Sequence, residues 1–245
     1  MHPVMFRWRS LTIHSYPALQ YLGLVAGVLA ANFAAHAAGL DAFRVFVATC
    51  ILLAPALAGA RLLFVASHWR LYRLTPSRIW DRSEGGAAQY GGLLLAVPLS
   101  VPLLAFLQMP FAGFWDVSMV TIMVGMIFTR IGCLLNGCCS GRPSKSWISM
   151  SLPDHKGVWE QRIPTQLLEA GWAVILLASA IAIWSSLPFQ GALFLFVSAG
   201  YACGRLLMES TRSTAQERRT LTLHHAISLL IILVSVAALT ARGAK

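Results

Sequence analysis

Seven long apolar segments constrain the fold of this 245-residue chain more than any other feature. Each has roughly the 17–25 residues that an α-helix needs to cross the hydrocarbon core of a bilayer. The segments are residues 16–35, 45–66, 90–109, 117–135, 167–187, 191–207 and 223–239. Only 11% of the residues are charged, against about 25% in a soluble domain, and the mean hydropathy is +0.68. The sequence therefore predicts an all-α polytopic membrane protein, folded as a single membrane domain over residues 1–245, with about seven transmembrane helices and a polar site at one interface.

The net charge of +10 is distributed over short loops rather than concentrated on one soluble face. This distribution argues against nucleic acid as a partner and favours anionic phospholipid. We do not expect the N-terminal sequence M-H-P-V-M-F-R-W-R-S to be a signal peptide, because the apolar segment that follows is long and no small-residue cleavage site clearly follows it.

The basic loop residues are segregated to one side of the predicted helices. With seven crossings, thirteen lie on one side: Arg7, Arg9, Arg70, Arg73, Arg78, Arg82, Arg142, Lys145, Lys156, Arg162, Arg212, Arg218 and Arg219. Three lie on the other side: Arg44, Arg242 and Lys245. By the positive-inside rule, the N-terminus is expected in the cytoplasm and the C-terminus outside.

The remaining arginines, Arg61, Arg130 and Arg205, lie near the helix ends that face the basic side. Arginines that converge at one interface are typical of an anion site. The alternative is that each one snorkels to the interface, or pairs with Glu169 or Glu209 in a structural network. The group as a whole favours a functional site, since ionisable residues in spanning segments are usually functional.

The most informative stretch is residues 129–143, T-R-I-G-C-L-L-N-G-C-C-S-G-R-P, which ends an apolar run. An arginine at the depth of Arg130 costs about 2.5 to 3.5 kcal/mol on insertion scales, so we expect an anionic partner for it. Asn136-Gly137 predicts the end of a helix, with Gly137 in the left-handed conformation. Further upstream, the glycines of residues 80–92 suggest an interfacial loop that approaches a lipid headgroup.

Two more polar patterns lie on the predicted helices. Gln166 and Glu169 are three residues apart and share a helix face. A polar stripe follows on the sixth predicted helix, formed by Tyr201, Arg205, Glu209 and Arg212. The pair His224-His225 opens the last segment at the same interface, where a structural role is the more common one.

Five cysteines form no paired framework, and Cys50 and Cys203 lie in apolar segments as small hydrophobic residues. Three interpretations remain for Cys133, Cys138 and Cys139. They pack a tight turn, or one is a nucleophile whose thiolate is stabilised by Arg130 or Arg142. The third is metal binding with His155, His224 or His225, although C-x4-C-C is not a usual zinc spacing. We expect no metal or other cofactor.

Together these motifs resemble the prolipoprotein diacylglyceryl transferase family over nearly the whole chain. The start, H-P-V-M-F and I-H-S-Y-P, is similar to that of the family, so that Tyr16 matches a functional tyrosine. The central signature is matched by Arg130, Gly132, Asn136, Gly137, Gly141 and Arg142. The segments I-P-T-Q-L-L-E and Y-A-C-G-R-L-L-M-E-S-T-R resemble the two later motifs of the family.

The resemblance implies a multi-pass enzyme of the bacterial inner membrane. It would transfer a diacylglyceryl group from phosphatidylglycerol to the thiol of a lipoprotein signal-peptide cysteine, releasing glycerol phosphate. On this interpretation Arg130 and Arg205 hold the phosphate, with Asn136 and Gln166 as polar positioners. Tyr16 and Tyr90 contact the headgroup or acceptor. The remaining expected binding residues are Arg61, Gly137, Arg142, Glu169 and Glu209, the two glutamates orienting the arginines.

The chain departs from the family pattern at three positions. Tyr90 stands where the family has a histidine before a glycine pair, and tyrosine, with a pKa of about 10, is a poor base near neutral pH. Cys133 and Cys138 replace the asparagine and glutamate of the signature, and with Tyr90 they are expected catalytic positions. The charge bias also places the site at the cytoplasmic face, whereas the family site faces outward. The alternatives are transfer to a non-lipoprotein acceptor, such as a small thiol, at the cytoplasmic face, or a non-catalytic lipid-binding or thiol sensor protein.

Overall fold

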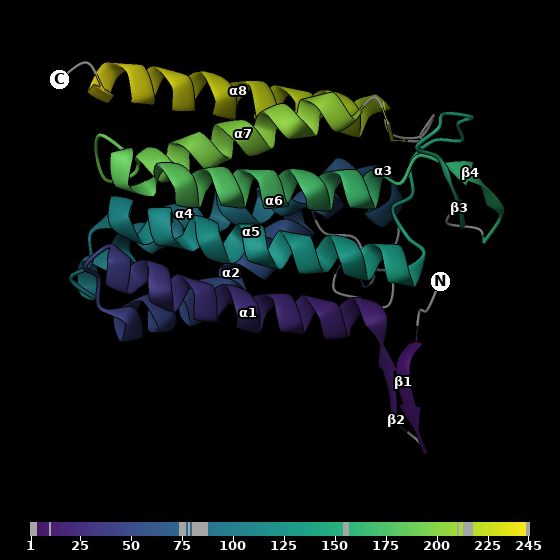
Figure 1. Cartoon of the computed structure of the whole chain (residues 1–245), viewed down its shortest axis with the longest axis horizontal. Coiled ribbons are helices and arrows are strands. Elements are labelled where there is room, and N and C mark those ends of the chain that lie inside the picture. Colours follow the sequence, from purple (N-terminus) through teal and green to yellow (C-terminus); the bar gives the residue numbers. More distant parts are fainter. Residues whose placement is uncertain are drawn as a thin grey trace.

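The computed structural model describes residues 4–9, 11–73, 77, 79, 88–153, 157–209, 211–212 and 218–243. Its main body is a bundle of long helices that lie side by side and run back and forth (Figure 1). Within the described part, seven helices are long and apolar enough to cross a membrane. They are α1 (Ser15–Ala37), α2 (Ala42–Ser67), α4 (Gln89–Phe106), α5 (Phe111–Asn136), α6 (Thr165–Ile183), α7 (Ala192–Glu209) and α8 (Arg218–Gly243). The predicted all-α polytopic architecture is confirmed.

The largest difference from the predicted spans is at the start of α5, which begins at Phe111 rather than at residue 117. The additional turn includes the buried carboxylate of Asp116. One of its oxygens accepts a hydrogen bond from the backbone N–H of Gly191 at 2.6 Å, and the other from Phe194 at 2.8 Å. Gly191 directly precedes α7 and Phe194 lies in its first turn, where backbone N–H groups have no intrahelical acceptors. Asp116 is thus accommodated inside a spanning helix because it caps a neighbouring helix.

Glycines allow the closest helix contacts. Gly59 of α2 and Gly91 of α4 face each other so closely that a Cβ on either would overlap the carbonyl oxygen of the other. On α1, a Cβ at Gly27 would lie 2.8 Å from the carbonyl oxygen of Thr121 in α5. Small residues at such crossings are typical of membrane helix pairs, whose backbones approach for van der Waals contact. The interfacial-loop interpretation was therefore wrong for Gly91 and its neighbour Gly92, which pack against α2; residues 80–87 lie outside the described part.

One end of the bundle carries most of the non-helical structure (Figure 1). The hairpin of β1 (Val4–Trp8) and β2 (Leu11–His14), the short helix α3 (Trp69–Tyr72) and the hairpin of β3 (Met150–Pro153) and β4 (Trp159–Arg162) lie here. The N-terminus is at this end and the C-terminus at the other, as an odd number of crossings requires. The helices α5 and α7 end here and α6 begins here, so the positions predicted for the site are brought to one end.

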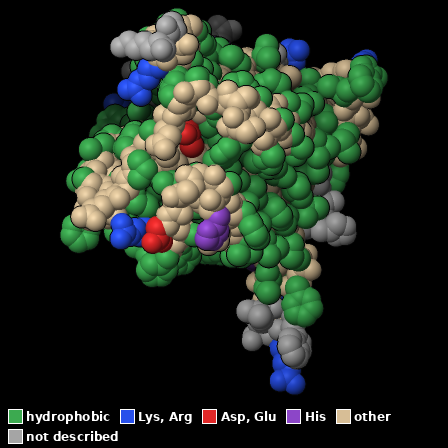
Figure 2. Space-filling model, turned by 60° about the vertical axis from the view of Figure 1, so that its left-hand side comes forward, with side chains coloured by type: hydrophobic (Ala, Val, Ile, Leu, Met, Phe, Trp, Pro, Cys, Tyr) green, Lys and Arg blue, Asp and Glu red, His purple; other side chains and the backbone are tan. Residues whose placement is uncertain are grey.

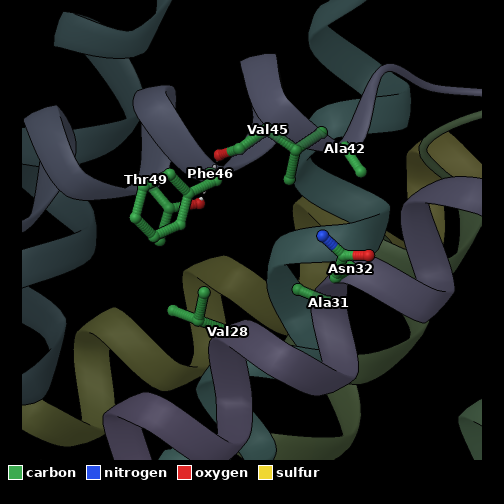
Figure 3. Close-up of a pocket in the computed structure, with 7 residues that line it drawn as sticks. All are labelled: Val28, Ala31, Asn32, Ala42, Val45, Phe46 and Thr49. Carbon is green, nitrogen blue, oxygen red and sulfur yellow. Dashed lines mark hydrogen bonds between the residues drawn. The ribbon is translucent and has the colours of Figure 1, made fainter.

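The opposite end is poor in charge. Figure 2 turns this end toward the viewer and shows mostly hydrophobic side chains, with few basic or acidic ones. A hollow of about 210 Å³ lies here, lined by Ala38, Gly113, Asp116, Trp184, Leu187, Phe189, Gln190 and Leu193. A smaller crevice between α1 and α2 is lined by Val28, Ala31, Asn32, Ala42, Val45, Phe46 and Thr49 (Figure 3). Neither hollow is lined by a residue predicted for the site.

Candidate functional site

Glu169, in the first turns of α6, is the centre of a cluster of arginines. Its carboxylate oxygens lie 2.5 Å from Nε of Arg130 in α5, 3.3 Å from Nη1 of Arg205 in α7 and 3.7 Å from Nη1 of Arg212. The side chains of Arg130, Glu169 and Arg205 are 15%, 10% and 12% exposed, so water screens these ion pairs weakly. A single carboxylate therefore aligns three guanidinium groups that come from three different segments.

The predicted polar stripe of α7 completes this cluster. Nη2 of Arg205 lies 3.2 Å from a carboxylate oxygen of Glu209, one helical turn further on. Tyr201, one turn earlier, donates its hydroxyl proton to Oε1 of Gln89 in α4 at 2.8 Å, and its hydroxyl lies close enough to Arg130 to interact with it electrostatically. Three arginines and two glutamates leave the cluster with one excess positive charge. A monoanion such as a phosphodiester would balance it, and guanidinium groups bind phosphate oxygens with well-matched geometry.

The end of α5 brings two of the thiols together. Gly137 is left-handed, with φ of +74°, as predicted. The backbone N–H of Cys138 donates to the carbonyl of Cys133 at 3.0 Å, and that of Gly137 to Leu134 at 3.1 Å, which is the Schellman pattern. This motif folds the residue after the glycine back onto the last helical turn. The side chains of Cys133 and Cys138, five residues apart in sequence, therefore lie next to each other.

Cys139 adds a third thiol to this pair, and the three Sγ atoms lie within 4.8 Å of one another. Cys139 has φ of +63°, a left-handed conformation that is uncommon for a residue with a side chain. Hydrogen bonds from the thiols of Cys133 and Cys138, together with the charges of Arg130 and Arg205, lower the pKa of Cys139 well below that of a free cysteine. The sequence placed Cys133 and Cys138 in the site, and the structure adds Cys139 as the thiol whose environment most favours a thiolate.

The loop that carries the thiols is fixed by its neighbours. Nε2 of Gln166 donates to the carbonyl of Cys138 at 2.6 Å. The backbone N–H of Gly141 donates to the carbonyl of Ile163, and that of Arg142 to Thr211, both at 2.9 Å. A Cβ at Gly141 would lie 2.6 Å from the carbonyl oxygen of Thr211 and would overlap Oγ1 of Thr165. The thiols are therefore held beside the first turn of α6 and the end of α7, which carry the ion pairs.

Tyr16 and Tyr90 flank the cluster. The Cα atom of Tyr16 lies 3.4 Å from the ideal Cβ position of Gly132. The hydroxyl of Tyr16 is close enough to the three thiols and Arg130 to interact with them electrostatically. The hydroxyl of Tyr90 shares a 2.7 Å hydrogen bond with Ser228 of α8. The ring of Tyr90 also packs against Tyr201 and His224, each with ring centroids 5.9 Å apart. His224 thus contacts the site through Tyr90.

Three predicted residues hold more peripheral positions. Nε of Arg61 in α2 donates to the carbonyl of Ile79 at 2.7 Å, and its guanidinium stacks over the rings of Phe64 and Tyr72. In the described part, the ion pairs of Glu169 involve Arg130, Arg205 and Arg212 rather than Arg61. Arg142 is exposed and joins the site through its backbone, while Asn136 is an exposed residue at the end of α5. His155, proposed as a metal ligand, lies outside the described residues.

Gln89, which accepts from Tyr201, and Ser228, which hydrogen-bonds Tyr90, were not predicted as part of the site. No local pattern identifies them, because each contacts its partner across more than a hundred residues of sequence. Contact between Cys133 and Cys138 had a usable signal, since the first residue after a left-handed glycine commonly packs on the last helical turn.

The fold and the site define an integral membrane protein with a buried arginine and glutamate cluster and free thiols at one end of its helix bundle. The family model for prolipoprotein diacylglyceryl transferase matches residues 3–241, and the chain belongs to this family. A phosphatidylglycerol-prolipoprotein diacylglyceryl transferase of Clostridium botulinum is 27% identical over 245 residues, covering 96% of each chain. One of Streptococcus equi subsp. zooepidemicus is 24% identical over 242 residues, covering 96% of this chain and 93% of the relative. The family resemblance predicted from the motifs is confirmed.

Proposed function

We propose that this chain is a phospholipid-dependent transferase that moves a diacylglyceryl group from phosphatidylglycerol to the thiol of a prolipoprotein cysteine. The names of its relatives favour this reaction over transfer to another acceptor and over a non-catalytic role. The observation that carries the proposal is the placement of Arg130 and Arg205 on a single glutamate at one end of the helix bundle. As a multi-pass protein of the bacterial inner membrane, it would take its donor directly from the bilayer.

The excess positive charge supports a phosphodiester donor. Phosphatidylglycerol carries one negative charge at its phosphate, which would balance the charge of the cluster. Glu169 and Glu209 keep the guanidinium groups oriented before the lipid binds, so little reorganisation is needed when charge develops. Arg61 lies at the same end of the bundle with its guanidinium held by Ile79, Phe64 and Tyr72, and we expect at most a peripheral contact with the headgroup.

The chemical step is a displacement at the glyceryl carbon that bears the phosphate. The acceptor sulfur forms a bond to this carbon, and the carbon–oxygen bond to phosphate breaks. The electron pair leaves with the oxygen, so that glycerol phosphate is released with a second negative charge. Arg130 and Arg205 stabilise this charge as it grows, in a site that is largely screened from water. The thiol proton must be removed, because the thiolate is the nucleophile.

The acceptor peptide would reach the phosphate from the side of the thiols. Tyr16 and Asn136 stand at the edge of this loop, and Gln166 and Arg142 fix its backbone. Tyr90 is held by Ser228 and lies near Arg205, which supports a role in positioning the headgroup. We expect the acceptor thiol to attack from beside the three thiols, which lie next to the arginines.

The test is a transfer assay in vesicles that contain phosphatidylglycerol and a lipobox peptide. We expect mass spectrometry to find peptide that has gained a diacylglyceryl group with the intact protein. Arg130→Ala should lower the rate about 10²- to 10³-fold, the usual cost of removing a donor to a developing anion. Arg242→Ala, at the opposite end of the bundle, is the control and should leave the rate unchanged. Unmodified peptide with the intact protein would contradict the proposal.

A further inference from the structure

The cluster of Cys133, Cys138 and Cys139 has the composition of a metal site with three protein ligands. All three cysteines are free, and their Sγ atoms lie within 4.8 Å of one another. We propose that these thiols bind one Zn²⁺ ion, and that the fourth coordination position of the ion takes the thiol of the acceptor cysteine. The second part of this inference rests on the proposed function, while the metal site itself does not.

The geometry favours zinc with an open position. Zinc lies about 2.3 Å from a thiolate sulfur, so sulfurs in a tetrahedral site are roughly 3.8 Å apart. The cluster would have to contract by at most about 1 Å to hold the ion. Catalytic zinc sites keep three protein ligands and leave the fourth position to water or substrate, whereas structural sites use four. Among the described residues, no fourth Cys, His, Asp or Glu ligand atom belongs to the cluster.

The backbone supports a preformed site. Schellman geometry sets Cys138 against Cys133, and the left-handed conformation of Cys139 turns its thiol toward both. A second, independent observation comes from Gln166, which is 1% exposed. Its Nε2 is used by the carbonyl of Cys138, but its buried Oε1 accepts no hydrogen bond from the part of the chain that the structure describes. This acceptor belongs to the amide that bonds the backbone of Cys138, and it would be satisfied by a zinc-bound water or by an N–H group of the incoming peptide.

The metal would supply what Tyr90 does not. The hydroxyl of Tyr90 is engaged with Ser228, and an acceptor thiol needs to lose its proton. A thiol that coordinates zinc is deprotonated outright. In the step that we propose, the acceptor sulfur displaces the zinc-bound water and its proton passes to solvent. The zinc-bound sulfur then attacks the glyceryl carbon, the carbon–oxygen bond breaks, and glycerol phosphate leaves. The thioether product is a weak ligand, so water displaces it.

The first test is a measurement of metal, made on the intact protein purified in detergent under reducing conditions. We expect about one zinc per chain by elemental mass spectrometry, the stoichiometry of a single site. Replacing zinc with Co²⁺ should give intense thiolate-to-cobalt absorption. Serine variants at Cys133, Cys138 and Cys139 should each lower the affinity by more than about 100-fold. The matched controls are Cys50→Ser and Cys203→Ser, which lie in apolar segments of α2 and α7 and should retain the metal.

The second test asks whether the acceptor thiol binds the metal. A lipobox peptide should change the cobalt absorption, and the same peptide with serine in place of its cysteine should not. Chelation should abolish diacylglyceryl transfer and added Zn²⁺ should restore it. Metal-free protein that retains full transfer, or serine variants of the three cysteines that do so, would overturn the inference and leave the proposed function intact. Bound zinc without any transfer would overturn the acceptor role together with the proposed function, and would leave only the metal site.

Discussion

Arg130 of α5 and Glu169 of α6 lie 2.5 Å apart, nitrogen to oxygen, at the end of the bundle where the N-terminal hairpin also lies. The same carboxylate contacts Arg205 and Arg212. A buried carboxylate shared by several guanidinium groups fixes their positions without cancelling their charge. We propose that this arrangement binds one anion, the phosphate of the lipid donor.

Replacing Glu169 with glutamine tests this relationship. Loss of one partner from a buried ion pair costs about 3–5 kcal/mol, because the remaining charge is left without compensation. We expect Glu169→Gln to lower the thermal stability in detergent and to reduce the transfer rate about 100-fold, since the arginines lose their orientation. Asp41→Asn is the control, because Asp41 and Arg44 form an exposed pair that contributes at most about 1 kcal/mol. Similar effects of the two variants would contradict the role of Glu169.

Gly141 tests whether the loop positions the thiols. An alanine there would meet the Thr211 carbonyl and Thr165, so the loop must shift away from α6. We expect Gly141→Ala to lower transfer at least about tenfold while the helices remain folded, as circular dichroism would report, because a displacement of about 1 Å is enough to affect a site. At Gly171→Ala a Cβ meets nothing within 4 Å, and alanine favours the helix by about 1 kcal/mol. Loss of activity in both variants would argue against a local effect.

The crossing of α2 and α4 gives a prediction about stability alone. Gly59→Ala would force the two backbones apart, and overpacking of this kind costs typically about 1–3 kcal/mol. Thermal unfolding in detergent should show the loss. Gly125→Ala in α5 should show none, because a Cβ there meets no atom within 4 Å. An unchanged unfolding temperature for Gly59→Ala would mean that the helices do not approach as described.

Replacing Tyr90 with phenylalanine distinguishes two roles for this residue: the base that activates the acceptor thiol, or a group that only positions the headgroup. In Tyr90→Phe the hydroxyl of Ser228 loses its partner, at a cost of about 1–3 kcal/mol of stability. If Tyr90 only positions the headgroup, the transfer rate should remain within about tenfold of the original, a change of about 1.4 kcal/mol in the barrier. Tyr21→Phe, on the exposed face of α1, is the control for losing a hydroxyl. Complete loss of transfer in Tyr90→Phe alone would make Tyr90 the base and remove the need for a metal.

Hydropathy alone predicted the number and approximate places of the helices, because a bilayer requires long apolar segments whatever their packing. The start of α5 was missed since Asp116 is tolerated through tertiary hydrogen bonds that local sequence does not reveal. The two small hairpins also escaped prediction. Their strands are four or five residues long and depend on pairing rather than on a strong pattern.

The site was predictable only where its residues share a helix face, because local sequence shows spacing along a helix but not contacts between helices. Helical spacing placed Arg205 with Glu209, and Gln166 with Glu169, on shared faces. The sequence offered Glu169 and Glu209 as partners of the arginines. Which helices meet is a tertiary property, so the structure was needed to assign Arg130 to Glu169. The arrangement of the three thiols was predictable only in part. Asn136-Gly137 predicted the turn, but the proximity of Cys139 to Cys133 depends on a left-handed cysteine that residue preferences do not suggest.

The most direct test of the central claim is to quantify both products of a single reaction, the diacylglyceryl peptide and the released glycerol phosphate. The displacement that we propose produces them in equal amounts from phosphatidylglycerol, and Arg205→Ala should lower both together. Equal amounts, falling in parallel, would support attack of the acceptor thiol at the glyceryl carbon with the arginines on the phosphate. Release of glycerol phosphate without modified peptide, or modified peptide formed at the same rate in Arg205→Ala, would contradict it.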